Sequence, residues 1–235
     1  MTKGLCSLFL RPQRHVNTLF LPQMSGAADH CTCRTDVALR TYLAEFFLIN
    51  VTDAELDKVL RLYPQDPTQG SPFDTGTQNT LTPEFKRIAS LLGDLNFQAP
   101  RRFFLDSLSG KQNAWSYCKL HRFPSLFAQL TVLSYAHVDS HIVSKRQKSL
   151  PILGSAHSSD ISVIYGGGDL TDYLIHFTNN LNPNGASLPQ WPEYSNSSPK
   201  LLTLYDSPIS TNITLDTYRA EGMKFVTSLL IKHPE

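Results

Sequence analysis

Apolar residues recur at three- and four-residue intervals in several stretches of this chain, which is the spacing of an amphipathic helix. The stretch 36–47 carries Val37, Leu39, Leu43 and Phe46 in this pattern and is predicted to be helical. Residues 1–35 show no comparable periodicity. The regular part of the chain is therefore expected to begin at about residue 36.

Local end signals define the next two predicted helices. Thr52 and Glu55 form a T-x-x-E capping box, and the helix that follows it stops at Pro64. Pro83 follows Thr82 and is expected at the first helical position of the next helix. The apolar stripes of these two helices consist of Leu56, Val59, Leu60 and Tyr63, and of Phe85, Ile88, Leu92 and Leu95.

The C-terminal part of the chain predicts two more helices. A turn at 166–168, rich in glycine, precedes a helix over 172–181 that ends before Pro183. The last helix is predicted over 216–232, with Val226, Leu229 and Leu230 facing inward.

Only a few strands are predicted beside these helices, near 115–117, 150–156 and 201–205. A helix-rich α/β pattern with so few strands matches the last part of a doubly wound parallel sheet better than a whole one. The predicted fold class is therefore α/β and incomplete.

The segment Leu150–Ile161 carries the candidate chemistry. It begins as a short apolar strand, breaks at Gly154 and Ser155, and places His157 on a polar loop. A histidine just past the end of a buried strand is where an α/β enzyme holds a general base. An ordinary loop histidine is the alternative reading of the same residues.

Three further blocks change the weight of these readings. The chain around the histidine segment resembles the C-terminal part of fungal lipases in the type-B carboxylesterase/lipase family. The matching blocks are, in order, residues 69–107 before the segment and 178–195 and 216–222 after it. The resemblance implies that 36–235 is the C-terminal portion of an α/β-hydrolase domain, preceded by the poorly matching segment 1–35.

The same resemblance implies a role for His157. The family places its catalytic histidine in a G-[ST]-x-H-x-x-[DE]-[IL] segment, so His157 is the implied general base of an ester hydrolase, a lipase or an esterase. The matching positions here are Gly154, Ser155, His157, Asp160 and Ile161.

The other parts of a serine-esterase triad are not found. No G-x-S-x-G motif, which carries the nucleophile in this fold, occurs in the 235 residues. At the family's acidic position the best counterpart is Val16, with Asp29 or Asp36 as weaker alternatives. The chain is therefore expected to be inactive alone. The alternatives are a non-catalytic, cholinesterase-like interaction protein and a decayed gene product.

Residues 118–143 interrupt the resemblance. The flanking sequences, Trp115 to Tyr117 and the run from Ser144, match the family directly. Codons for Cys118, Lys119 and Leu120 can contain the splice-donor sequence GTAAGT, and codons for Ile142 and Val143 can contain an acceptor TAG. Excising the stretch between these two splice sites keeps the reading frame and restores W-S-Y-[LF]-S-K. We therefore expect a retained intron, with a genuine surface loop as the alternative.

Composition excludes several function classes. The net charge is +1 and no long block of one sign occurs, which argues against a nucleic-acid partner. No apolar run approaches the roughly 20 residues of a membrane span. Cys31 and Cys33 are too close together and too isolated for a zinc site, so no metal and no cofactor are expected. An ester or lipid substrate is implied by the resemblance, while the oligomeric state is left open.

Three N-glycosylation sequons, at Asn50, Asn196 and Asn212, have meaning only in a secreted chain. The apolar run after Lys3 is short for a signal peptide, whereas the resemblance favours secretion. The localisation therefore stays open at this point.

Overall fold

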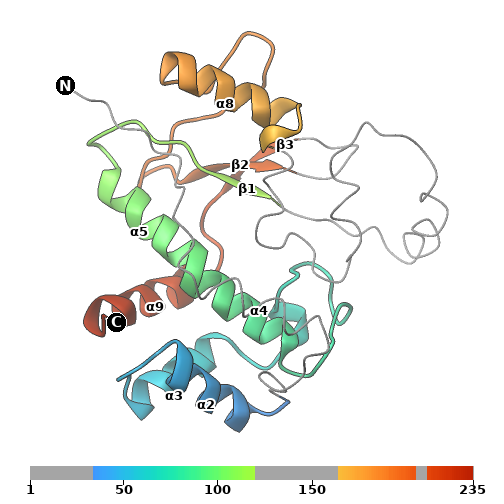
Figure 1. Cartoon of the computed structure of the whole chain (residues 1–235), viewed down its shortest axis with the longest axis vertical. Helices are drawn as coiled ribbons and strands as arrows, with labels where there is room; N and C mark the ends of the chain where they lie inside the picture. The colour runs from blue at the N-terminus through green and yellow to red at the C-terminus, as the bar shows by residue number, and fades with distance from the viewer. Residues whose placement is uncertain (1–33, 120–163, 205–210, 235) are drawn as a thin grey trace, which may run out of the picture. The chain divides into compact units, whose positions relative to one another are not determined.

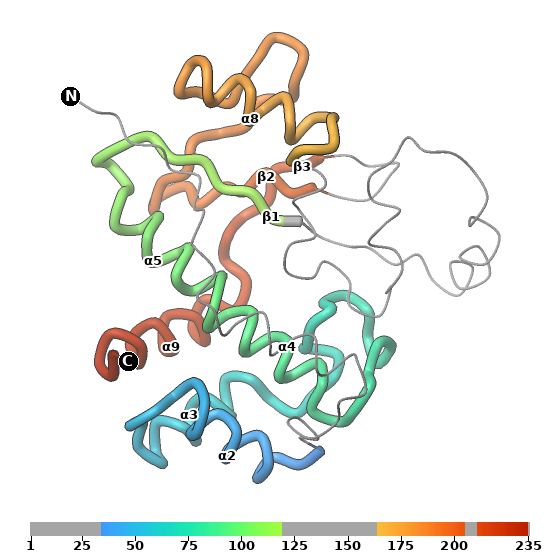
Figure 2. The backbone as a smooth tube through the Cα atoms, viewed as in Figure 1, coloured from blue at the N-terminus to red at the C-terminus, as the bar shows by residue number. Residues whose placement is uncertain are grey.

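The computed structural model of the chain describes residues 34–119, 164–204 and 211–234. These residues form two compact units (Figures 1 and 2). The helical unit consists of 34–107 and 217–234, and the sheet unit of 108–119, 164–204 and 211–216. The domain boundary at residue 36 and the insertion 118–143 stay predictions.

The helical unit begins with two short helices joined by a tight turn. Helix α2 (Asp36–Phe46) confirms the first predicted helix, and helix α3 (Asp53–Leu62) ends before Pro64 as expected. The capping box at the start of α3 is present in full: Thr52 accepts from the Glu55 amide, and the Glu55 carboxylate accepts from the Thr52 amide. Two pattern residues of α2, Val37 and Phe46, are more than half exposed, so its buried stripe is narrower than predicted.

The third helix begins later than predicted. Helix α4 (Phe85–Gly93) begins two residues beyond Pro83, because Glu84 and not Thr82 is its N-cap residue. It continues through a π-helical turn, η2 (Asp94–Gln98), into helix α5 (Ala99–Leu108). The prediction that Pro83 occupies the first helical position is therefore wrong. A short 3₁₀ turn, η1 (Pro67–Gln69), lies between α3 and α4.

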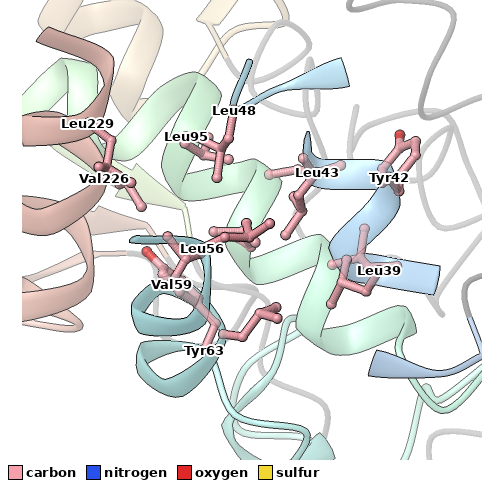
Figure 3. Close-up of a cluster of buried hydrophobic side chains, with 14 of the residues drawn as sticks. Leu39, Tyr42, Leu43, Leu48, Leu56, Val59, Tyr63, Leu95, Val226 and Leu229 are labelled. Atoms are coloured by element: carbon pink, nitrogen blue, oxygen red, sulfur yellow. The ribbon is translucent and has the colours of Figure 1, made fainter. Parts of the chain in front are cut away.

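Helix α9 (Ala220–Lys232) completes the helical unit and starts four residues later than predicted. Figure 3 shows the common core of these helices, where Leu39, Leu43, Val59 and Val226 have no exposed surface. Burying one such side chain is worth about 1.5–3 kcal/mol, so the apolar stripes supply most of the packing energy of this unit.

The sheet unit contains three strands in the order β1-β2-β3. Strand β1 (Tyr117–Lys119) pairs in parallel with β2 (Lys200–Leu204), which confirms a parallel element in the sheet. Strand β3 (Thr211–Leu215) pairs antiparallel with β2 and was not predicted, so the described sheet is mixed. The strand predicted over 150–156 lies outside the described residues.

Helix α8 (Asp169–Asn180) belongs to the same unit and ends at Leu181, which has a left-handed backbone just before the Asn182-Pro183 pair. Its buried residues Leu170 and Tyr173 pack with Trp191, Leu202 and Leu204. The predicted helix is confirmed, with a start three residues earlier. The described residues of both units make an α/β structure that is rich in helix.

An ion pair in the helical unit gives the fold a defined response to acid. Lys232 Nζ lies 2.7 Å from Glu55 Oε1. The hydrogen bond from Lys232, followed by those from the Thr52 amide and hydroxyl, lowers the pKa of Glu55 from 4.5 to about 2. A lowered pKa means that the stabilisation is complete above about pH 4.5 and is lost as the pH falls toward 2.

We therefore predict that Lys232→Met, which removes the largest cause of the shift, makes the chain less stable at pH 6 and less sensitive to pH between 4.5 and 2. Thermal unfolding followed by circular dichroism across this range measures both effects. Lys224→Met changes an exposed lysine of the same helix and is the control. An unaltered pH profile in the Lys232 variant would show that this pair does not govern acid stability.

Candidate functional site

The predicted general base, His157, lies outside the described residues, and so do Val16 and Asp29. Asp36, the remaining alternative for the acid, is described: its carboxylate lies 2.6 Å from Arg87 Nη1. This ion pair gives Asp36 a structural role at the start of α2.

The sheet unit holds the described residues on both sides of the His157 segment, which are β1 before it and Ile164 after it. Ile164 is buried together with Tyr173 of α8 and Leu204 of β2. Tyr173 and Trp191 meet edge to face with their ring centroids 5.2 Å apart. The described chain after the histidine segment is therefore fixed by an aromatic core.

Thr171 of α8 closes the turn that follows Ile164. Its hydroxyl donates to the Ile164 carbonyl at 2.7 Å and accepts from the Gly167 amide at 3.1 Å. Gly167 and Gly168 have φ values of 84° and 113°, a region that favours glycine. The glycine-rich turn thus leads into a helix, as the sequence predicts.

A second polar contact fixes the loop that approaches β1. The Trp191 indole donates to the Ser116 carbonyl at 3.2 Å, immediately before the strand. The Asn184 side chain binds both backbone groups of Trp191, at 2.7 and 2.9 Å. These bonds hold the segment 182–194, which contains Pro and Gly and forms no helix or strand, against the sheet.

An ion pair of the helical unit, between Asp94 and Arg219, was not predicted from the sequence. Asp94, at the start of η2, has no exposed surface. Its carboxylate accepts from Arg219 Nε at 2.8 Å, from Arg219 Nη2 at 2.6 Å and from the Tyr63 hydroxyl at 2.9 Å. Arg219 also stacks on the Phe73 ring, 4.0 Å from its centroid.

This environment raises the pKa of both partners of Asp94. Burial, followed by the neighbouring carboxylate, raises the pKa of the Tyr63 phenol, which therefore stays neutral and able to donate. Burial opposes the charge on Arg219, but the hydrogen bonds and charge of Asp94 outweigh it and raise the pKa of the guanidinium. Gly222 of α9 leaves room for Tyr63, since a Cβ there would lie 3.1 Å from the phenol oxygen.

Lys86 of α4 is a second buried cation. Its ammonium donates to Thr75 Oγ1 at 2.6 Å, to the Gly76 carbonyl at 2.8 Å and to the Gln78 carbonyl at 3.2 Å. Burial lowers the pKa of Lys86. All three N–H groups are occupied by the loop 75–78, so this lysine holds the loop and is not available as a nucleophile.

The buried charges described above are therefore already paired or fully hydrogen-bonded, which is the chemistry of a structural network. Residues 34–119, 164–204 and 211–234 contain no group of three or more side chains that could hold a metal ion. Within these same ranges no helix combines the length and the apolar character that crossing a membrane requires.

We predict that Asp94→Asn costs about 3–5 kcal/mol of unfolding free energy, because it leaves the partly buried Arg219 guanidinium without its counter-charge. Tyr63→Phe removes one hydrogen bond to the same carboxylate and should cost less, about 1.5–3 kcal/mol. Urea unfolding of both variants measures the difference. Equal midpoints for Asp94→Asn and the wild type would show that the pair contributes no stability.

Comparison with known proteins shows that this chain is similar in sequence to fungal lipases. It is 39% identical over 170 residues to Lipase 4 of Diutina rugosa, a match that covers 70% of this chain and 26% of that lipase. It is 31% identical over 219 residues to Lipase 2 of Geotrichum candidum, covering 86% of this chain and 34% of the relative. Secreted lipase 1 of Botryotinia fuckeliana is 33% identical over 206 residues, covering 83% and 32%.

The chain thus spans between about a quarter and a third of the length of these relatives. No family model matches it. Among solved structures, a thermophilic pNB esterase is similar over 82% of this chain and 33% of that structure, with 16% identity and a TM-score of 0.44, a likeness too low to establish a shared fold. The sequence identities show that the matched part of this chain belongs to the lipase and carboxylesterase-like α/β-hydrolase family.

Proposed function

We propose that this chain is the C-terminal part of a type-B carboxylesterase/lipase, an enzyme that hydrolyses carboxylic esters, and that His157 is its general base. The observation that carries the proposal is the 39% identity to a lipase over 170 residues, combined with the G-S-x-H-x-x-D-I segment around His157. Because the Botryotinia relative is named a secreted lipase, we extend secretion to this chain as part of the proposal.

In this chemistry the histidine removes the proton of a serine hydroxyl as the serine attacks the ester carbonyl. It then returns the proton to the leaving alcohol, while a carboxylate orients its ring. The described sheet unit supports such a role by anchoring the chain shortly after the histidine, through Ile164 and the Thr171 hydroxyl. A histidine without a serine partner supplies only one part of this mechanism.

The 235 residues contain no G-x-S-x-G motif, and we propose that they do not hydrolyse esters at an enzymatic rate by themselves. Losing the serine or histidine of a triad costs on the order of 10⁶ in kcat in subtilisin. The general-base role of His157 is therefore tested in a protein that also contains the catalytic serine and the acid.

The test is a chimera in which residues 36–235, with 118–143 replaced by a single leucine, take the place of the matching part of Diutina rugosa Lipase 4. We expect p-nitrophenyl butyrate hydrolysis by the chimera, and a fall in kcat of at least 10⁴ in its His157→Ala form, on the scale of triad removal. His176→Ala, on α8, is the matched histidine control and should keep the activity.

Two outcomes would contradict the proposal. Turnover by the chimera that survives His157→Ala would show that another group is the base. A chimera that folds, reacts with no serine-hydrolase probe and turns over no ester would favour the non-catalytic interaction protein. Light scattering on the 235-residue chain then separates a soluble binding module from an aggregating, decayed product.

We further propose that residues 118–143 are encoded by a retained intron. In the structure Cys118 and Lys119 are the last two residues of β1 and pair with Thr203 and Leu204. Removing the insertion would place leucine or phenylalanine at the first of these positions and Ser144 at the second. Both replacements suit a strand, so β1 is expected to keep its length.

Sequencing cDNA across the junction between Tyr117 and Ser144 checks this prediction. We expect most transcripts to lack the insertion and to encode W-S-Y-[LF]-S-K. Abundant polysome-bound transcripts that retain it would show instead that it is translated as a genuine loop.

A further inference from the structure

Asn50 lies at the start of a sequon, Asn50-Val51-Thr52, in the turn that joins α2 to α3. We infer that Asn50 is an acceptor site for an N-linked glycan and that the folded helical unit carries this glycan without rearrangement. The inference is independent of ester hydrolysis and requires only that the chain enters the secretory pathway.

The turn points Asn50 away from the core. Its neighbours Leu48 and Val51 belong to the core or pack against it, whereas Asn50 is exposed. The Val51 amide donates to the Leu48 carbonyl at 3.3 Å, which closes the turn behind Asn50. The Asn50 side chain makes no hydrogen bond to the described residues, so attaching a sugar to it breaks no contact there.

The backbone at this position gives asparagine a second, purely conformational reason to be present. Asn50 has a φ of 65°, in the left-handed region that asparagine tolerates better than most residues. The hydroxyl of Thr52 likewise has a structural use, because it donates to Glu55 Oε2 at 2.8 Å in the capping box. A test must therefore separate the sequon from the turn and from the cap.

The stretch of chain just before Asn50 also exposes large apolar side chains. Ile49 and Phe46 are 46% and 54% exposed, although both are large apolar side chains. A hydrated oligosaccharide on the adjacent residue shields such surface from other molecules. The glycan is therefore expected to increase solubility as well as mass.

The modification itself is a group transfer. The donor is an oligosaccharide linked through pyrophosphate to a membrane lipid. The Asn50 amide nitrogen forms a bond to the anomeric carbon of the first sugar, the bond from that carbon to the pyrophosphate oxygen breaks, and the amide proton is released while the lipid pyrophosphate leaves. The product is a neutral, solvent-directed amide-linked glycan.

Two other sequons serve as internal comparisons. Asn196 and Asn212 are also exposed, the first in the turn between Ser195 and Ser198 and the second in strand β3. The Asn212 side-chain oxygen accepts from the Ile213 amide at 2.8 Å. Removing these two acceptors, with Asn196→Gln and Asn212→Gln, leaves Asn50 as the site under test.

The experiment translates the whole chain, behind a cleavable secretion leader, in the presence of microsomes, and protease protection confirms that the chain has entered them. In the background without the other two sequons we expect one glycan, seen as a mass that peptide-N-glycosidase removes. Asn50→Gly, which tolerates the positive φ, should abolish it.

A matched pair at Thr52 separates sequon from cap. Thr52→Ser keeps both and should remain glycosylated, whereas Thr52→Asn keeps an N-cap residue but destroys the sequon and should not. Protected chain that carries no removable mass in the Thr52→Ser form would overturn the inference. So would an equal mass in the Asn50→Gly or Thr52→Asn form.

Discussion

The helical unit depends on the pairing of charges that α4 and the following turn carry into its interior. Glu84, Lys86, Arg87 and Asp94 are all buried, and a buried charge is costly unless it is paired and hydrogen-bonded. Glu84 pairs with Arg87, and Lys86 donates to neutral oxygens of the loop 75–78. Arg87 finds Asp36 and the Leu60 carbonyl, and Asp94 finds Arg219. These requirements bring together segments that are far apart in sequence.

The apolar contacts and the buried charges make different contributions to this unit. Leucine, isoleucine and valine side chains supply packing energy that many arrangements of helices could provide. The Arg87 guanidinium accepts far fewer arrangements, because it binds the Leu60 and Tyr63 carbonyls at the end of α3 together with the Asp36 and Glu84 carboxylates. The polar network thus fixes the end of α3 and the start of α2 against α4.

Hydrophobic periodicity predicted α2, α3, α8 and α9, because each has an apolar stripe and at least one recognisable end. Periodicity did not predict the elements whose position or formation depends on tertiary contacts. Helix α4 begins at Phe85 because Glu84 is buried and bound by Gln65 and Arg87, which no local pattern reveals. No residue of strand β3 is fully buried, and Asn212 and Leu215 are exposed, so its alternation is weak. The strand forms because β2 offers it a partner along five residues.

The candidate site shows a different limit of sequence reasoning. Local physics identified His157 as a histidine beyond an apolar strand, which many proteins contain, and only the resemblance of the flanking blocks gave it a chemical role. The buried pair of Asp94 and Arg219 was missed because the two residues are 125 positions apart. An acidic residue within an apolar helical stripe is the one local signal that could have indicated it.

The parallel pairing of Tyr117 with Leu202 has a consequence for how the chain tolerates changes in length. Forming this pair closes a loop of roughly 85 residues, and the entropy of closing a loop grows only with the logarithm of its length. Shortening that loop by about a third would change the closure free energy by about 0.3 kcal/mol. The sheet is therefore nearly indifferent to the number of residues between these strands, and selection on stability through this pairing would hardly distinguish a long connection from a short one.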